Sequence, residues 1–426
     1  MAPVILAACA GGGPGVTPSP TPTVVSTVTP MATPTPAPTA EPTATPAPTT
    51  APTPTGVTVP GVTDDEIILG THTSLTGPIA VYSQIPNTTK AYFDFINETK
   101  GGVNGRKIKY LLEDDAYSPP KTVDLVRKLV EQDQIFALVN GLGTPTHLQV
   151  VDYLQEQGVP DLFVASGAIE WVKDPAARPM VFGSLTNYVG EGLILGQYIA
   201  ESFAGQKLGL MRQNDDFGLD GITGIRRGVG DALEIVGEET HEVLDADLNA
   251  QVDRLKAAGA DVIAIWATPR QFSTAIKHAR LDLDWDVPFV LTVVSANEFS
   301  VALAGPEVLE GTVSLAYLRQ GWEVDDPGVA KHLEIIRQYS DIENANNLTL
   351  YGQWIGELME EVLKLAGEDL TRESLIKAAE SVTDFQCSVC LFTATMSSTD
   401  HDPVQAAFLA RAEGGRWVRF GKLISY

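Results

Sequence analysis

Residues 101–120 read GGVNGRKIKYLLEDDAYSPP, and this stretch decides the fold because it holds a helix end, a strand and a helix start. Apolar residues recur at helical spacing before it, and Gly101-Gly102 ends that helix because glycine adopts backbone angles that other residues resist. Asn104-Gly105 then predicts a tight turn. The chain therefore passes from one helix towards a strand within five residues.

The second half of the stretch predicts a strand followed by a helix. Residues 108–112 alternate in the manner of a strand, and residues 113–115 are expected to close it with solvated charge. Ser118 is expected to cap the next helix, which starts with Pro119-Pro120, where a missing N–H costs nothing.

The same unit repeats further along the chain. Residues 135–139 read as a buried strand, residues 141–145 turn the chain, residues 148–154 continue as a helix, and residues 159–164 form another strand. Strands that alternate with helices indicate an α/β fold with a parallel sheet covered on both faces.

Four segments together carry a family resemblance. GTHTSLTGP at 70–78, the stretch 101–120, GLGTP at 141–145 and VASG at 164–167 occur in the right order and spacing. The chain resembles the leucine/isoleucine/valine-binding family of type I periplasmic binding proteins, which are the solute receptors of branched-chain amino acid ABC transporters. The resemblance covers nearly everything from about Val62 to Tyr426.

The resemblance implies two doubly wound α/β lobes joined by a three-crossing hinge. The crossings are expected near Thr186, at residues 316–319 and between residues 395 and 405. The first lobe would comprise residues 61–186 plus 317–400, and the second residues 187–316 plus 401–426.

The first sixty residues differ in composition from the rest. Residues 10–60 are rich in Thr, Pro, Ala and Val with almost no charge, which predicts a disordered tether. Residues 1–9 are interpreted as a truncated lipoprotein signal, because Leu6-Ala-Ala-Cys9 resembles a lipobox and makes Cys9 the lipid attachment site. The apolar run is short and lacks a charged leader, so we expect the true start to lie upstream. These features predict an extracytoplasmic protein anchored to the outer face of the bacterial membrane.

Charge and cysteine usage narrow the classes of function. A net charge of −25 argues against nucleic acid as a partner. Cys387 and Cys390 read as a local disulfide or two free thiols, because their extended surroundings do not suit a redox motif. The six His residues show no metal-ligand spacing, so neither a metal nor a cofactor is expected.

Two segments are expected to hold a carboxylate beyond the ends of the parallel strands, where helix N-termini point free N–H groups into the crevice. One is centred on Thr144, between a glycine and a proline that starts a helix. The other is Ala165-Ser166-Gly167, which follows a buried strand directly. Thr144 and Ser166 also suit helix capping, and the two roles are compatible.

The resemblance supplies the remaining candidate ligand contacts. Tyr82 in GPIAVY matches an aromatic wall residue, Phe217 takes the place of the usual tyrosine in the second lobe, and a further wall residue falls at residues 266–268, where Trp266 and Thr268 are the candidates. Core packing explains Phe217 and Trp266 about as well.

The family's ammonium-binding acid is expected directly after the strand at residues 288–292, where this chain has Val293. The only acid nearby is Glu298, further along. A buried ammonium without a carboxylate is unfavourable. Val293 therefore favours an aliphatic or aromatic carboxylate, or an amide, over an amino acid.

Three functions remain open at this point. The first is a monomeric, membrane-tethered receptor that closes around a small amino-acid-like or carboxylate ligand and delivers it to an ABC transporter permease without catalysis. The second is an enzyme, although no nucleophile elbow, phosphate loop or acid/base pair supports one. The third is a sensor ectodomain.

Overall fold

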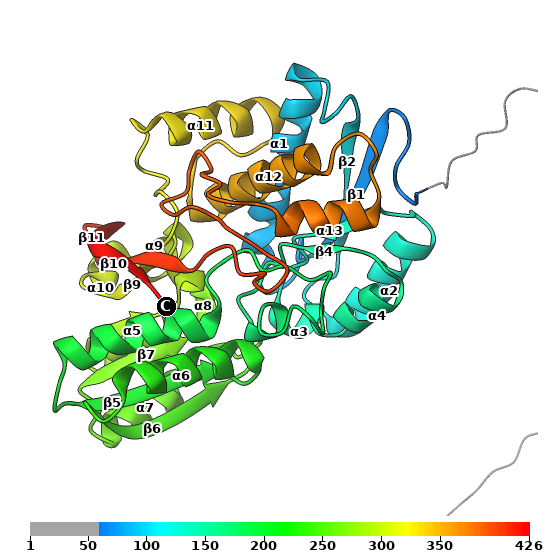
Figure 1. Ribbon diagram of the computed structural model, residues 1–426. Coiled ribbons are helices and arrows are strands. Elements are labelled where there is room, and N and C mark those ends of the chain that lie inside the picture. Colours follow the sequence, from blue (N-terminus) through cyan, green and yellow to red (C-terminus); the bar gives the residue numbers. More distant parts are fainter. Residues whose placement is uncertain (1–58) are drawn as a thin grey trace, which may run out of the picture. The chain divides into compact units, whose positions relative to one another are not determined.

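The computed structural model describes residues 59–426, which form two α/β lobes, each built around its own sheet (Figure 1). The predictions for the lipoprotein signal, for Cys9 and for nearly all of the tether at residues 10–60 lie outside the described residues.

The first lobe contains a four-stranded parallel sheet in the order β2-β1-β3-β4. Its strands are β1 (Glu66–Thr73), β2 (Lys107–Asp114), β3 (Ala137–Val139) and β4 (Asp161–Leu162). The helices of this part of the chain are η1 (Ala80–Ser83), α1 (Gln84–Thr99), α2 (Pro119–Glu131), α3 (Thr144–His147), α4 (Val151–Glu156) and η2 (Ile169–Trp171).

The second lobe contains a seven-stranded sheet in the order β11-β10-β9-β8-β7-β5-β6. Its strands are β5 (Lys207–Gln213), β6 (Glu234–His241), β7 (Val262–Trp266), β8 (Phe289–Leu291), β9 (Val313–Ala316), β10 (Ala406–Glu413) and β11 (Arg416–Ser425). Its helices are α5 (Tyr188–Ser202), α6 (Asp216–Val229), α7 (Asn249–Ala257), α8 (Pro269–Lys277), η3 (His278–Asp282), η4 (Val293–Ser295), α9 (Glu298–Ala304) and α10 (Pro306–Leu309). The expectation of parallel strands holds for β5 to β9, whereas β10 and β11 run antiparallel as a hairpin at one edge.

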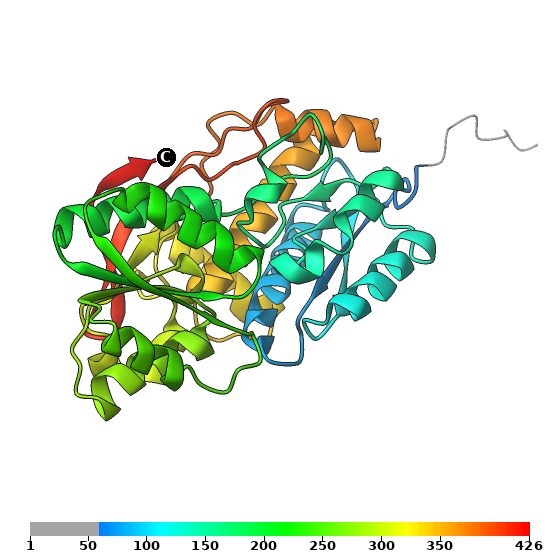
Figure 2. The same ribbon diagram turned by 90° about the horizontal axis from the view of Figure 1, so that it is seen from below.

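The chain passes between the lobes three times, as the predicted hinge requires. It leaves the first lobe before α5, returns after β9, and leaves again after α13 to form β10 (Figure 2). The returning segment forms α11 (Pro327–Tyr339), α12 (Asn347–Ala366) and α13 (Arg372–Glu380), and α12 packs against α1. The two-lobed α/β fold is thus confirmed, while the lobe boundaries given from the sequence stay predictions.

The stretch 101–120 folds as its local pattern predicts. Helix α1 ends at Thr99, and Gly101 and Gly102 follow with φ of 73° and 89°, which favour glycine. Strand β2 and helix α2 come next, with Pro119 in the first turn of α2.

Three details of the sequence analysis are wrong. Asp115 is completely buried rather than solvated, because its carboxylate accepts hydrogen bonds from His72 and Thr122. Ser118 occupies the N-cap position of α2, but its side chain makes no capping hydrogen bond. The helix expected over residues 148–154 begins only at Val151, because α4 spans Val151–Glu156 and the separate helix α3 ends at His147.

Both sheets direct the loops that follow their parallel strands towards one region. The loops after β3 and β4 come from the first lobe, and those after β5, β7 and β8 come from the second. Loops after parallel strands commonly carry ligand sites in folds of this kind. This region holds the cavity described next.

Candidate functional site

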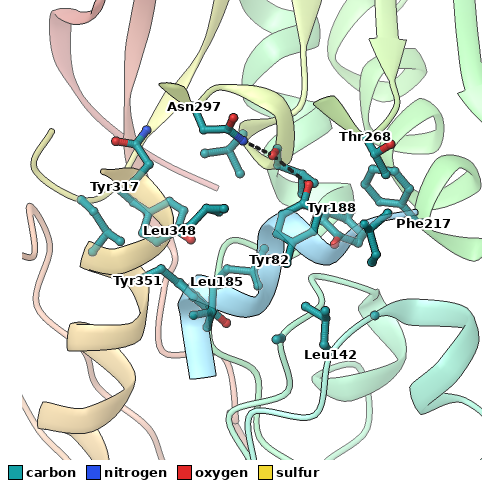
Figure 3. A pocket seen from close by; sticks show the side chains of 18 of the residues that line it. Tyr82, Leu142, Leu185, Tyr188, Phe217, Thr268, Asn297, Tyr317, Leu348 and Tyr351 are labelled. Atoms are coloured by element: carbon teal, nitrogen blue, oxygen red, sulfur yellow. Dashed lines mark hydrogen bonds between the residues drawn. The ribbon is translucent and has the colours of Figure 1, made fainter. Parts of the chain in front are cut away.

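A cavity of about 120 Å³ lies between the two lobes. Side chains from both lobes and from the returning helix α12 form its wall (Figure 3). Six aromatic residues line it: Tyr82, Tyr117, Tyr188, Phe217, Tyr317 and Tyr351. Its other lining residues are aliphatic or carry uncharged polar groups, and none is Asp, Glu, Lys, Arg or His.

Six of the nine ligand-contact residues predicted from the sequence line this cavity. They are Tyr82, Thr144, Ala165, Phe217, Thr268 and Val293. The three that do not line it are Ser166, Gly167 and Trp266. The role of each residue in binding stays a prediction, but the fold brings most of them together.

The first-lobe loops meet through a hydroxyl pair. Thr144 Oγ1 lies 2.6 Å from Ser166 Oγ, so one hydroxyl donates to the other and the pair retains one proton for a third group. Gly143 has φ of 97°, and a Cβ there would overlap the Tyr117 ring, so only glycine fits this turn. Ser166 does not line the cavity itself, but its hydroxyl contacts that of Thr144, which does.

The expected anion site at the start of α3 is weaker than the sequence indicates. Gly143, not Thr144, is the N-cap residue, and α3 has only four residues. The N–H groups of Gly143 and Ala165 already donate to backbone carbonyls, at 3.2 Å and 2.9 Å. Thr144 does not cap the helix, because its hydroxyl bonds Ser166 instead. The short helix contributes little dipole.

The second-lobe wall is formed where β5 and β7 end. The ring of Phe217, at the start of α6, packs edge-on against Tyr188 with 4.9 Å between centroids. Thr268 follows β7, and its hydroxyl donates to the side chain of Gln271. Phe217 and Thr268 both reach the cavity.

Trp266 lies in the core rather than at the cavity. Its side chain is fully buried, and a Cβ at Gly221 in α6 would overlap its indole ring. The last residue of β7 therefore packs under α6, while Thr268, two positions later, lines the cavity. Of the two positions left open for Trp266 by the sequence, ligand contact and core packing, the structure shows core packing.

Val293 is backed by an acid that the sequence analysis missed. Its N–H donates to Glu191 Oε1 at 2.6 Å, and Glu191 lies on α5, fully buried and outside the cavity lining. Burial raises the pKa of the Glu191 carboxyl to about 8, and hydrogen bonds from residues 293, 292 and 186 oppose this only partly. The available signal was a single acid within the otherwise uncharged segment 188–199.

Hydrogen bonds join the lobes at several points around the cavity. Tyr82 Oη donates to the Val294 carbonyl at 3.2 Å. The Ile169 N–H donates to Asp220 Oδ2 at 2.8 Å. The Asn347 N–H, at the start of α12, donates to Glu298 Oε2 at 3.0 Å. Glu298, the only acid near Val293 in sequence, thus bonds the opposite lobe and does not line the cavity.

Asp220 differs from Asp216, the other acid of α6, because it is half-buried and its pKa is raised. Burial raises its pKa to about 6, and the hydrogen bond from the backbone of the first lobe opposes that rise. Its position beside the first lobe has no signature in the sequence, because it depends on how α6 meets the loop after β4.

A chain of four buried side chains lies behind the first-lobe loops. Asp115 Oδ2 lies 2.9 Å from His72 Nδ1, His72 Nε2 lies 2.9 Å from His147 Nδ1, and His147 Nε2 lies 2.7 Å from Asp161 Oδ2. All four side chains are almost fully buried. Since His147 ends α3, this chain ties the loop that carries Thr144 to the strands behind it.

Cys387 and Cys390 form a disulfide, which decides between the two alternatives left by the sequence. It lies beside the crossing that follows β9: Leu318 and Cys390 form a β-bridge, and the Leu391 N–H donates to the Tyr317 carbonyl at 3.0 Å. The disulfide therefore supports a segment that contributes to the cavity wall.

Within residues 59–426, no helix is both long enough and apolar enough to cross a membrane.

Comparisons with known proteins agree with this architecture. The family described as periplasmic binding protein matches residues 66–416. An amino acid binding protein of Pseudomonas aeruginosa is 26% identical over 217 residues, which are 50% of this chain and 57% of that protein. A leucine-, isoleucine-, valine-, threonine- and alanine-binding protein of the same organism is 24% identical over 253 residues, which are 59% of this chain and 66% of that protein. The chain thus matches less than two thirds of the length of either relative.

A solved structure shares the fold over most of its length. It is a branched-chain amino acid ABC transporter protein from Thermus thermophilus with bound valine, with a TM-score of 0.76 and 22% identity. The match covers 86% of this chain and 98% of that one. At this identity the likeness concerns the arrangement of the lobes.

Proposed function

This chain belongs to the periplasmic binding protein family, and from that premise we propose that it is an extracytoplasmic receptor that captures a small solute between its lobes for an ABC transporter. The ligand is an apolar molecule with one carboxylate or amide head and no α-ammonium group. The observation that carries this proposal is a cavity between the lobes whose lining contains no charged side chain.

The uncharged lining argues against an amino acid as ligand, and it favours a neutral amide head over an ionised carboxylate, which would have only the free hydroxyl proton of the Thr144/Ser166 pair to bind it. An α-ammonium buried there would have no carboxylate partner, and this costs several kcal/mol. Glu191 does not replace the missing acid, because burial raises its pKa to about 8 and leaves it mostly neutral at pH 7. Val293 lies between Glu191 and the cavity.

The head group is assigned to the hydroxyl pair of Thr144 and Ser166. One hydroxyl proton of the pair is free to donate to a carboxylate or amide oxygen. The apolar part of the ligand would contact Tyr82 and Phe217, whose rings supply large apolar surfaces from opposite lobes.

Lobe closure provides the capture step. The hydrogen bonds from Tyr82 to Val294 and from Ile169 to Asp220 join the lobes, so they form only when the lobes meet. We assign no catalytic step to the protein, which would act as a monomer. Cys9 would carry the lipid anchor and residues 10–60 would connect it to the lobes. The permease of the transporter would be its protein partner.

A thermal-shift series tests the ligand class. Leucine, isovalerate and isovaleramide share one side chain but differ in their head groups. A ligand at 100 times its dissociation constant should stabilise the folded protein by about 2.7 kcal/mol. We expect isovalerate or isovaleramide to raise the melting temperature and leucine to leave it unchanged. Strong stabilisation by leucine alone would overturn the assignment.

Two further measurements test the head-group site and the absence of catalysis. Thr144→Ala combined with Ser166→Ala should weaken binding at least tenfold, since it removes both hydroxyls. The half-buried Thr223→Ala on α6, outside the cavity lining, serves as a matched control. Unchanged affinity in the double variant would refute the head-group assignment. Conversion of a bound acid or amide into a new product would refute the receptor proposal.

A further inference from the structure

The cavity continues beyond the site predicted from the sequence. In Figure 3, Phe217 and Thr268 lie at one end, Tyr317, Leu348 and Tyr351 lie at the other, and the Tyr82 ring lies between the ends. None of the nine predicted contacts belongs to the second end. A compact ligand held at the hydroxyl pair would leave that second end unused.

We name the second end the hinge compartment and define it by Leu315, Tyr317, Leu318, Gln320, Leu348 and Tyr351. Its residues come from β9, from the crossing that follows β9 and from α12. Three leucines make its wall apolar, and the other three side chains, Tyr317, Gln320 and Tyr351, carry uncharged polar groups.

The hydroxyl of Tyr317 has no hydrogen-bond partner within residues 59–426, yet its oxygen is not sealed within the protein. It therefore opens onto the cavity that its side chain lines. Tyr351 shows the contrast, because its hydroxyl accepts from Asn140 Nδ2 at 3.1 Å and also bonds Ser184. Tyr317 alone offers an unused phenolic donor at this end.

Gln320, from the same crossing segment, adds an acceptor to the compartment. Its Nε2 makes one long hydrogen bond, 3.4 Å to the Leu318 carbonyl, while its Oε1 has no partner in the described chain and is not sealed within the protein. The compartment thus combines apolar walls with one O–H donor and one amide acceptor, and it contains no charged group. This set fits a neutral group that both accepts and donates, such as a hydroxyl.

We infer that the hinge compartment binds the distal end of an elongated ligand, a rod-shaped acid or amide whose apolar or aromatic body ends in a neutral hydroxyl. The inference rests on the proposed function, since the head group would occupy the hydroxyl pair at the opposite end. A charged distal group is disfavoured because no ion partner faces it. The body of the ligand would pass Tyr82, and its tail would end between Tyr317 and Gln320.

Calorimetric titration with three ligands of increasing length tests the inference. The ligands are isovalerate, 3-phenylpropanoate and 3-(4-hydroxyphenyl)propanoate, each also used as its primary amide. Wild-type protein should bind them more tightly in that order, with the hydroxyl improving affinity about five- to tenfold, as one hydrogen bond of about 1 kcal/mol would.

Two variants separate length from hydrogen bonding. Leu348→Trp should fill the hinge compartment and weaken both phenyl ligands at least tenfold while leaving isovalerate unchanged. The same change at Leu281, a side chain that is 60% exposed, serves as the matched control. Tyr317→Phe should abolish the advantage of the hydroxylated ligand over the plain phenyl ligand and leave the plain ligand unaffected.

The outcomes distinguish this inference from the proposed function. Binding of isovalerate without tighter binding of the longer ligands would overturn the hinge compartment alone. Equal hydroxyl advantage in wild type and Tyr317→Phe would overturn the role of Tyr317. If none of the three ligands binds in either form, the proposed function fails and the inference fails with it. Retained isovalerate binding and an unchanged melting temperature confirm that each variant is folded.

Discussion

The buried carboxyl of Glu191 should make the stability of this protein fall as pH rises. Its Oε1 accepts the Val293 N–H at 2.6 Å, and its Oε2 lies 3.4 Å from the Thr186 hydroxyl. A glutamine has the same shape and can keep both contacts, since its carbonyl accepts from the N–H and its amide donates to the hydroxyl. Glu191→Gln therefore removes the titration while preserving the packing.

The sign and magnitude follow from the pKa of Glu191. Burial raises it from 4.5 to about 8, so between these pH values the folded protein holds a proton that the unfolded chain has released. Stability then declines with rising pH by about 1.4 kcal/mol per pH unit, or about 5 kcal/mol over the whole interval. The variant lacks this decline, so its advantage over wild type should grow from near zero at pH 4.5 to about 5 kcal/mol at pH 8.

Urea unfolding of both proteins, followed by tryptophan fluorescence at pH 5, 6, 7 and 8, measures this difference. Asp402, whose pKa burial raises to about 7, contributes a decline of the same sign to both proteins and cancels in the comparison. Parallel stability curves for the two proteins across this range would refute the reasoning, because they would mean that Glu191 is ionised at no extra cost in the folded state.

Three further predictions concern the lobe contact, the disulfide and the buried His/Asp chain. Asp220→Ala should speed ligand release five- to tenfold in stopped-flow experiments, because it removes the acceptor of a hydrogen bond that joins the lobes. Asp216→Ala, on the exposed side of the same helix, should leave the release rate unchanged. Equal release rates in the two variants would refute the role of this contact. Cys387→Ser with Cys390→Ser should lower the free energy of unfolding by about 2 kcal/mol, which is the loop-closure contribution expected for so short a loop. An unchanged free energy in chemical denaturation would contradict this prediction. His147→Ala should lower the free energy of unfolding by about 3 to 5 kcal/mol, because His72 and Asp161 both lose a buried hydrogen-bond partner. A loss under 1 kcal/mol would be inconsistent with the buried His/Asp network.

Local patterns predicted the elements well wherever neighbours in the chain decide the structure. The helix end at Gly101-Gly102, strand β2 and the start of α2 depend on periodicity and on the backbone preferences of glycine and proline. Burial of Asp115 escaped the same reasoning because its partner His72 lies 43 residues earlier in the sequence. An acidic run at a strand end looks solvated until its distant partner is known.

The candidate site shows the same limit. The expectation of a ligand site beyond the strand ends identified Thr144, and the family resemblance identified Phe217; both residues line the cavity. The resemblance also included Trp266, which faces α6. Near a strand end, a shift of two residues separates a core side chain from one at the cavity, and the sequence does not show where the strand stops.

The order of helices and strands, the turns and the family are determined by the sequence itself, because short-range periodicity and residue type suffice for them. Tertiary structure alone decided the character of the cavity. Glu191 meets Val293 across 102 residues of sequence, and Tyr82 meets Val294 across 212. The first contact forms when the second lobe folds, and the second forms when the two lobes meet. The absence of charge from the lining, the neutral acid behind it and the hinge compartment therefore follow from the packing of distant segments.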